Sequence, residues 1–140
     1  TIKQEDVLEL VASAREANIF TAIDAILEKR TGLGVRLVRK LLDSTATPSY
    51  VITMIARQVR LLILAKNLKL QGVPTDSIGN RIGLSGYPLK KTLQQEKRFS
   101  VHQLSSMHKE LLQTDVLIKT HGIDDQILLD TLIVDLALKY

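Results

Sequence analysis

The sequence predicts an all-α fold, a helical bundle of about seven helices around one long central helix. Two observations support this prediction. Apolar residues recur at spacings of three and four along the 140-residue chain, and no stretch shows the alternation typical of a strand. Hydrophobic residues make up 45% of the chain, which is enough to form a core in one domain.

The central helix is predicted over residues 48–71. Thr47 is a good N-cap, and Pro48 has its φ pre-set for the first helical position. Gly72 and then Pro74 end the helix. The interval without Pro or Gly allows roughly 24 residues, or about 36 Å at 1.5 Å per residue. Apolar residues cover so much of its circumference that other helices must pack on several sides.

The other helices follow from caps and breaks along the chain. Asn18 is expected to cap a helix with Phe20 on its apolar face, and the glycines of residues 31–34 are expected to break it. Ser100 and Gln103 form a capping-box pattern at the start of a long helix. The expected helices besides the central one span 3–14, 18–30, 35–43, 75–83, 88–98, 100–119 and 124 onward.

The charge is distributed unevenly along the chain, whose net charge is +4. Residues 29–98 carry 14 Lys and Arg against 3 Asp and Glu, whereas residues 1–28 carry 2 against 6 and residues 99–140 carry 3 against 6. A basic middle between acidic ends favours an anionic partner or head-to-tail contact between like domains. A solvated basic surface explains the same pattern.

Several kinds of chemistry find no support in the sequence. There is no Cys, hence no disulfide or thiolate, and no glycine-rich loop of the phosphate-binding type. The longest apolar run, residues 61–65, is too short to cross a membrane. His102, His108 and His121 lack the spacing of metal ligands and are interpreted as surface residues. We therefore predict no catalytic, cofactor-binding or metal-binding residue, no cofactor and no membrane contact.

Residues 75–98 resemble a helix-turn-helix pattern: a short helix, a glycine turn and a basic helix. Tyr87, Lys90 and Lys91 near the start of the second helix suit phosphates better than base edges. A free-standing DNA-binding domain is therefore the alternative function, and a plain helical hairpin within a bundle is the structural alternative.

Arg57 and Arg60 lie three residues apart on one face of the central helix. This position in a helix covered on several sides is poorly suited to solvent alone, so both are candidates for an interface with a partner. A salt bridge within the domain, for example to Asp115, is an equal alternative.

Short motifs follow one another along nearly the whole chain. They are Asp6-Val7 with Leu10-Val11, Asn18-Ile19-Phe20 with Asp24-Ala25-Ile26, Pro48, Ala56 to Arg60, Lys66, Ile82-Gly83, Pro88, Lys90-Lys91, Phe99-Ser100, Asp115, and Ile118-Lys119-Thr120 before Gly122. In this order and spacing, the chain resembles the C-terminal part of the bacterial DNA polymerase III delta subunit, a clamp-loader component.

The resemblance implies a helical collar domain that assembles beside the collars of the gamma/tau and delta-prime subunits in a five-membered ring. Residues 1–17 would be the end of the lid region and a connector, and residues 18–140 the collar, or oligomerisation domain. The contact with the sliding clamp would belong to an ATPase-like module N-terminal to Thr1. The resemblance implies a cytoplasmic role in DNA replication without enzymatic activity of its own.

Clamp loaders of this family hold primed DNA in a chamber roofed by the collar. Lys119, Thr120 and His121 are therefore DNA-contact candidates, at the turn before the last helix. Lys119 would neutralise a phosphate and His121 would stack on an unpaired base. Alternatively, Lys119 complements a helix C-terminus and His121 is merely exposed. Primed DNA is expected to bind weakly, or only in the assembled complex.

Overall fold

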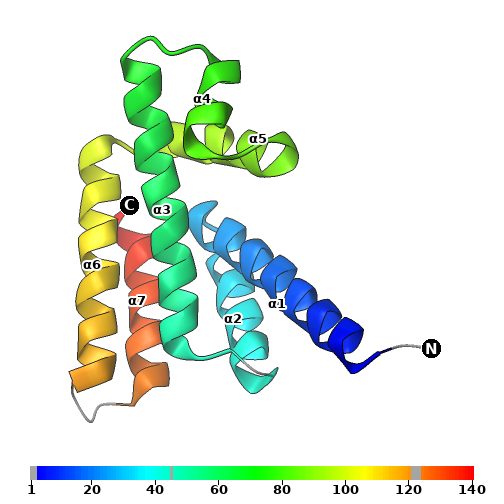
Figure 1. Ribbon diagram of the computed structural model, residues 1–140. Coiled ribbons are helices and arrows are strands. Elements are labelled where there is room, and N and C mark those ends of the chain that lie inside the picture. Colours follow the sequence, from blue (N-terminus) through cyan, green and yellow to red (C-terminus); the bar gives the residue numbers. More distant parts are fainter. Residues whose placement is uncertain (1–2, 45, 121–123) are drawn as a thin grey trace.

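The computed structural model describes residues 3–44, 46–120 and 124–140, and every regular element in these ranges is a helix (Figure 1). The prediction of an all-α bundle around a long central helix is confirmed. The elements are α1 (Gln4–Leu27), α2 (Thr31–Ser44), α3 (Pro48–Leu70), α4 (Thr75–Ile82), α5 (Gly86–Gln95), the 3₁₀ helix η1 (Glu96–Arg98), α6 (Val101–Thr120) and α7 (Asp125–Lys139).

The central helix α3 begins and ends where the sequence predicts. Thr47 accepts a hydrogen bond at Oγ1 from the backbone N–H of Tyr50 at 3.1 Å, and Pro48 occupies the first helical position. Gly72 adopts a φ of +82°, in the left-handed region that favours glycine after a helix. Figure 1 shows α3 between α6 and α7 on one side and α1 and α2 on the other.

One apolar cluster forms the core of the bundle. It joins the C-terminal half of α1 to α2, α3, α6 and α7, and none of its members among the described residues comes from α4 or α5. Burying a large aliphatic side chain contributes roughly 1.5–3 kcal/mol, so this cluster provides most of the stability. Its largest fully buried side chains are Ile19, Ile23, Leu27, Ile52, Ile55, Leu62, Leu104, Met107, Leu111, Leu129 and Ile133.

The two expected N-terminal helices are in fact one helix, so the prediction of a break before Asn18 is wrong. No Gly or Pro lies within α1, and one Asn costs less than roughly 1 kcal/mol in a helix interior. The helix therefore continues through Asn18. The prediction that Phe20 faces the core is also wrong, because Ile19 and Ile23 define the buried face and Phe20 is 42% exposed.

The prediction that the glycines of residues 31–34 end the preceding helix is wrong, because they lie in the first turn of α2. The reversal comes earlier, at Lys29, whose φ is +67°. A Cβ added to Gly34 would lie 2.8 Å from Cγ1 of Ile26. Glycine at this position therefore allows α1 and α2 to approach closely.

The helices α4, α5 and η1, residues 75–98, form a separate unit that we call the arm. Figure 1 shows the arm beside the C-terminal half of α3 and above the C-terminal end of α1. A Cβ on Gly79 would lie 2.7 Å from the carbonyl oxygen of Leu84 and 2.6 Å from Cδ2 of Leu89, so α4 closes tightly on the start of α5. The helix expected over 88–98 begins earlier and ends as a 3₁₀ turn.

Candidate interaction surface around Arg57

An exposed stripe runs along α3 between its buried faces. Thr53, Arg57, Arg60 and Leu64 are exposed at intervals of four, three and four residues, which keeps them on one side of the helix. Among the described residues, Arg57 and Arg60 make no hydrogen bond or salt bridge. The two arginines therefore present their charge to the surroundings.

The alternative pairing of these arginines with Asp115 is wrong. Asp115 accepts a hydrogen bond from Ser49 at 2.8 Å and a charged hydrogen bond from Lys119 at 2.7 Å. Burial acts to raise the pKa of Asp115, but the bonds from Lys119 and Ser49 outweigh it and lower that pKa. Asp115 thus connects the C-terminal end of α6 to the start of α3.

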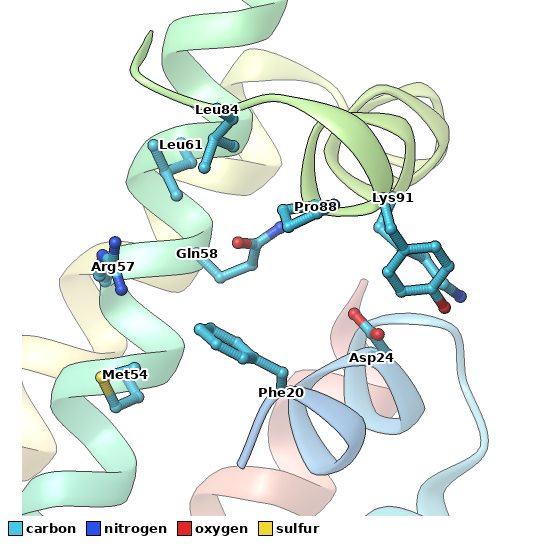
Figure 2. Close-up of a pocket in the computed structure, with 10 residues that line it drawn as sticks. Phe20, Asp24, Met54, Arg57, Gln58, Leu61, Leu84, Pro88 and Lys91 are labelled. Atoms are coloured by element: carbon cyan, nitrogen blue, oxygen red, sulfur yellow. The ribbon is translucent and has the colours of Figure 1, made fainter. Parts of the chain in front are cut away.

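A pocket of about 270 Å³ lies beside Arg57, between α3, α1 and the arm. In Figure 2, Phe20 extends from α1 into this space, and Gln58 reaches across from α3 toward Pro88. The walls are mostly apolar, and charged groups line the edge. The lining residues are Phe20, Asp24, Met54, Arg57, Gln58, Leu61, Leu84, Tyr87, Pro88 and Lys91.

A chain of side-chain hydrogen bonds through two amides, Gln58 and the buried Gln95, fixes the walls of the pocket. The Gln58 side chain donates from Nε2 to Thr92 at 3.2 Å and to Gln95 at 3.0 Å. Gln95 in turn donates to Asp24 at 2.6 Å and to Glu28 at 3.2 Å. Gln95 and Thr92 are each 1% exposed. Because hydrogen bonds are directional, these contacts set the position of α5 relative to both α1 and α3.

Charged pairs complete the attachment of the arm. Lys91 donates to both carboxylate oxygens of Glu28, at 3.2 and 3.0 Å, and this contact raises the pKa of Lys91. Burial alone raises the pKa of Glu28, yet hydrogen bonds from Lys91 and Gln95 reverse the direction and lower it. Burial raises the pKa of Asp24 more than its hydrogen bond from Gln95 lowers it. Lys91, the other cation that lines the pocket, and the nearby carboxylates of Asp24 and Glu28 are thereby engaged.

A second buried carboxylate holds η1 against α3. Glu96 is 1% exposed and accepts from Lys66 at 3.2 Å and from Lys69 at 2.9 Å. Burial acts to raise the pKa of Glu96, but hydrogen bonds from Lys69 and Lys66 outweigh it and lower the pKa. Lys66 also donates to the backbone carbonyl of Glu96 at 3.1 Å. This cluster ties the end of the arm to the bundle.

The sequence predicts no role for Asp24, Glu28, Gln95 or Glu96, although their contacts hold the arm that forms one side of the pocket. A usable signal was present: Asp24 and Glu28 lie four apart on one helix, and the acidic and amide pair Gln95-Glu96 interrupts an otherwise basic stretch. The sequence does not show that Gln95 pairs with Asp24 and Glu28, because these contacts join segments about 70 residues apart.

The histidines differ from one another. His102 is exposed, as predicted. The prediction of a surface position is wrong for His108, which is half-buried with its Nε2 unpartnered among the described residues. Burial, followed by the charge of Arg60, lowers the pKa of His108. His121 lies outside the described residues. Arg60 is therefore close enough to α6 to act on His108 electrostatically.

The C-terminal end of α6, which carries the DNA-contact candidates Lys119 and Thr120, lies at the opposite end of the bundle from the arm (Figure 1). Lys119 is bound to Asp115, its neighbour four residues earlier, and keeps 60% of its side chain exposed. Thr120 donates from Oγ1 to the carbonyl of Val116 at 2.7 Å. The structure therefore does not bring Lys119 and Thr120 together with Arg57 or Arg60.

Within residues 3–44, 46–120 and 124–140, no group of three His, Asp or Glu side chains is placed to hold a metal ion. In the same part of the chain, no helix is both long enough and apolar enough to span a membrane. The chemical features of the surface are thus an apolar pocket, an exposed arginine pair and polar contacts that fix their geometry.

Comparison with known proteins identifies the family. The family described as DNA polymerase III delta subunit, C-terminal domain, matches residues 16–136, which is most of the chain. The chain belongs to the DNA polymerase III delta subunit family. The resemblance inferred from the sequence motifs is confirmed.

Two delta-family relatives show how far the similarity extends. The chain is 27% identical over 135 residues to DNA polymerase III subunit delta of Bacillus subtilis (strain 168), covering 96% of this chain and 39% of the relative. The solved structure of the Bacillus subtilis DNA clamp loader delta protein matches with a TM-score of 0.79 and 27% identity, covering 97% of this chain and 40% of that one. The chain thus spans about two fifths of the length of these relatives.

The delta-family segment includes every residue that lines the pocket and both exposed arginines. Gln58, Lys66 and Lys91 belong to the motifs that suggested the family, and all three hold the arm in place. Arg57 and Arg60 belong to the same motifs and make no such contact among the described residues. Within this delta-family domain, the internal contacts therefore leave Arg57 and Arg60 available for a partner.

Proposed function

We propose that this domain is the collar, or oligomerisation domain, of a clamp-loader delta subunit, and that it helps assemble the complex that loads the sliding clamp during DNA replication. The observation that supports this most is the family match over residues 16–136, together with structural similarity to a clamp loader delta protein over 97% of the chain. The role is one of assembly, in the cytoplasm, and no catalytic step is assigned to these residues.

The proposed partners are the collar domains of the gamma/tau and delta-prime subunits. Arg57 and Arg60 on the exposed stripe of α3, which have no ion pair within the part of the chain that the structure describes, are the candidate contacts, and acidic groups on a neighbour would complement them. Contact with the sliding clamp is not assigned to any residue of this chain. The division between the end of the lid region and the collar at residues 17 and 18 is part of this proposal, and it is supported by the exposure of Val7, Leu8 and Leu10 and the burial of Ile19.

Assembly is tested by replacing both arginines. The Arg57→Ala, Arg60→Ala double variant is mixed with gamma/tau and delta-prime collar domains, and complex formation is followed by size-exclusion chromatography with light scattering. We expect the wild type to be largely monomeric alone and to join the complex, and the double variant to join it at least roughly tenfold more weakly, since charged hydrogen bonds contribute about 1.5–3 kcal/mol each.

The matched control is Arg36→Ala, Lys40→Ala, which removes the same charge from an exposed face of α2. This control should assemble like the wild type. A tight homodimer of the wild type, with no complex formed, contradicts the collar assignment. Equal assembly by the double variant and the control removes the arginines from the interface.

We also propose that Lys119, Thr120 and His121 face primed DNA once the complex is assembled. For Lys119, its exposed side chain at the end of α6 supports the proposal, while its bond to Asp115 is the competing use of its charge. For His121, the proposal depends on the sequence alone. In the assembled loader, His121→Ala should weaken binding to a primer–template junction, because stacking on a base contributes about 1–3 kcal/mol.

His102→Ala is the control for this experiment, because His102 is an exposed histidine at the other end of α6. Unchanged affinity of the His121→Ala loader would remove His121 from the mechanism. The isolated domain should bind DNA weakly, without sequence preference, and less as salt rises. Tight, sequence-selective binding would support the helix-turn-helix alternative instead, although Lys91, one of its phosphate candidates, is engaged by Glu28.

A further inference from the structure

The pocket beside Arg57 has the size of a site for one side chain. Its volume of about 270 Å³ lies just below the range of roughly 300–1,000 Å³ typical of sites for drug-sized ligands. Phe20, Met54, Leu61, Leu84 and Pro88 supply apolar walls. Pockets of this kind in protein interfaces receive a single buried anchor, most often an aromatic or large aliphatic residue.

The walls are fixed before any partner binds. Gln58 is held by Thr92 and Gln95, and Gln95 reaches on to Asp24 of α1, so all three helices around the pocket are connected by hydrogen bonds. Met54 contributes a flexible, unbranched apolar side chain to the lining, which suits a pocket that accepts more than one apolar shape. A pocket formed in advance loses less entropy when a partner binds.

The charge at the edge indicates which kind of partner segment fits. Lys91 is neutralised by Glu28, and Asp24 lies near Lys91 and accepts a hydrogen bond from Gln95. Arg57 is the charged lining residue that has no ion pair or hydrogen bond with the described part of the chain. Its planar guanidinium binds a carboxylate through two parallel hydrogen bonds.

We propose that this pocket receives one bulky apolar side chain, phenylalanine or leucine, from an acidic segment of a partner protein, with a neighbouring carboxylate bound by Arg57. The pocket thus specifies the chemistry of the partner: an apolar anchor flanked by acidic residues. This inference depends on the proposed function only for taking that partner to be an adjacent clamp-loader subunit.

The two methionines of the chain allow a direct test by ¹³C-methyl NMR. Met54 lines the pocket, and Met107 is buried in the core as an internal reference. The probe is an acetylated and amidated peptide with one phenylalanine between glutamates. We expect this peptide to shift the Met54 methyl signal saturably and to leave the Met107 signal unchanged. A Met54 signal that does not move overturns the proposal.

Matched peptides and variants separate the two parts of the recognition. Alanine in place of the phenylalanine, or lysines in place of the glutamates, should weaken binding at least roughly tenfold. Arg57→Glu should weaken it as much, whereas Arg36→Glu, the same charge change on an exposed face of α2, should change it less than about threefold. Equal binding of the lysine peptide, or full binding to Arg57→Glu, overturns the proposed partner chemistry.

The same reagents distinguish this proposal from the proposed function. If the domain joins the gamma/tau and delta-prime collars but no peptide moves Met54, the pocket proposal fails and the collar proposal stands. If the acidic peptide binds but the domain joins no complex, the pocket proposal stands and the collar proposal fails.

Discussion

Different interactions stabilise the bundle and attach the arm to it. The bundle is an aliphatic cluster from α1, α2, α3, α6 and α7, whereas the arm is attached through Gln58, Thr92, Gln95 and Glu96, with their charged partners. Apolar packing is strong but tolerant of small displacements, and hydrogen bonds are individually weaker but directional. The bundle therefore supplies stability, and the polar contacts fix where the arm, and with it the pocket, lies.

The largest expected effect comes from breaking the bundle side of this comparison. Leu62→Ala removes a side chain that is 0% exposed in the middle of α3, and a cavity of this kind costs about 2–5 kcal/mol. The free energy of unfolding is measured by urea denaturation. Leu64→Ala, two residues away and 50% exposed, should cost less than about 1 kcal/mol. Similar losses in both variants would contradict the assignment of the core.

Local sequence patterns predict the main features of the bundle but not the pocket beside the arm. The apolar spacing around Leu62 and the caps at Thr47 and Ser100 depend on residues within four positions, so they are predictable, and the structure confirms them. The pocket depends on contacts such as Gln95 with Asp24, across 71 positions, which local spacing does not encode.

The wrong predictions for Gly34 and Asn18 also arise because local patterns do not encode contacts between distant segments. Local preference predicts that Gly34 breaks a helix, whereas in the structure Gly34 lets α2 approach Ile26 of α1. Local preference also predicts a cap at Asn18, but one weak preference does not interrupt a helix that has no Gly or Pro. In both cases tertiary packing or helix continuity outweighs the local preference of one residue.

The next largest effect tests the arm. Glu96→Gln keeps the shape of a buried side chain but removes the charge that binds Lys66 and Lys69. We expect a loss of about 1–3 kcal/mol, less than for a fully buried pair because both lysines are partly exposed. Hydrogen exchange should increase in α5 and η1 and stay low in α3 and α6. Asp43→Asn, at an exposed carboxylate, is the control. Uniform acceleration across the bundle would contradict an independent arm.

The effect of Glu96→Gln should also depend on pH. Contacts with Lys69 and Lys66 outweigh burial and lower the pKa of Glu96 below its ordinary value of 4.5. A lowered pKa in the folded state means that the stabilisation is complete above the unfolded pKa and is lost as pH falls through the folded pKa. The difference in unfolding free energy between wild type and variant should therefore be constant above about pH 5 and shrink below pH 4.5. A difference that grows on acidification would contradict the lowered pKa.

The smallest effect on stability is expected at the exposed stripe of α3, which belongs to neither side of the comparison. Arg57→Ala and Arg60→Ala together should change the free energy of unfolding by less than about 0.5 kcal/mol, because neither side chain is bonded to another described residue. The arginines still differ in one measurable way. Arg60 contributes to the lowered pKa of His108, after burial, so removing Arg60 should raise that pKa while removing Arg57 leaves it unchanged.

An NMR titration of His108 measures this difference between the two single variants, with exposed His102 as the reference signal. A higher pKa in Arg60→Ala alone, with unfolding unchanged, would show that the stripe can be altered without disturbing the bundle or the arm. Any loss of assembly in the double variant then belongs to the interface itself. A loss of stability above about 1 kcal/mol would instead place the arginines in internal contacts and remove the basis for their role in assembly.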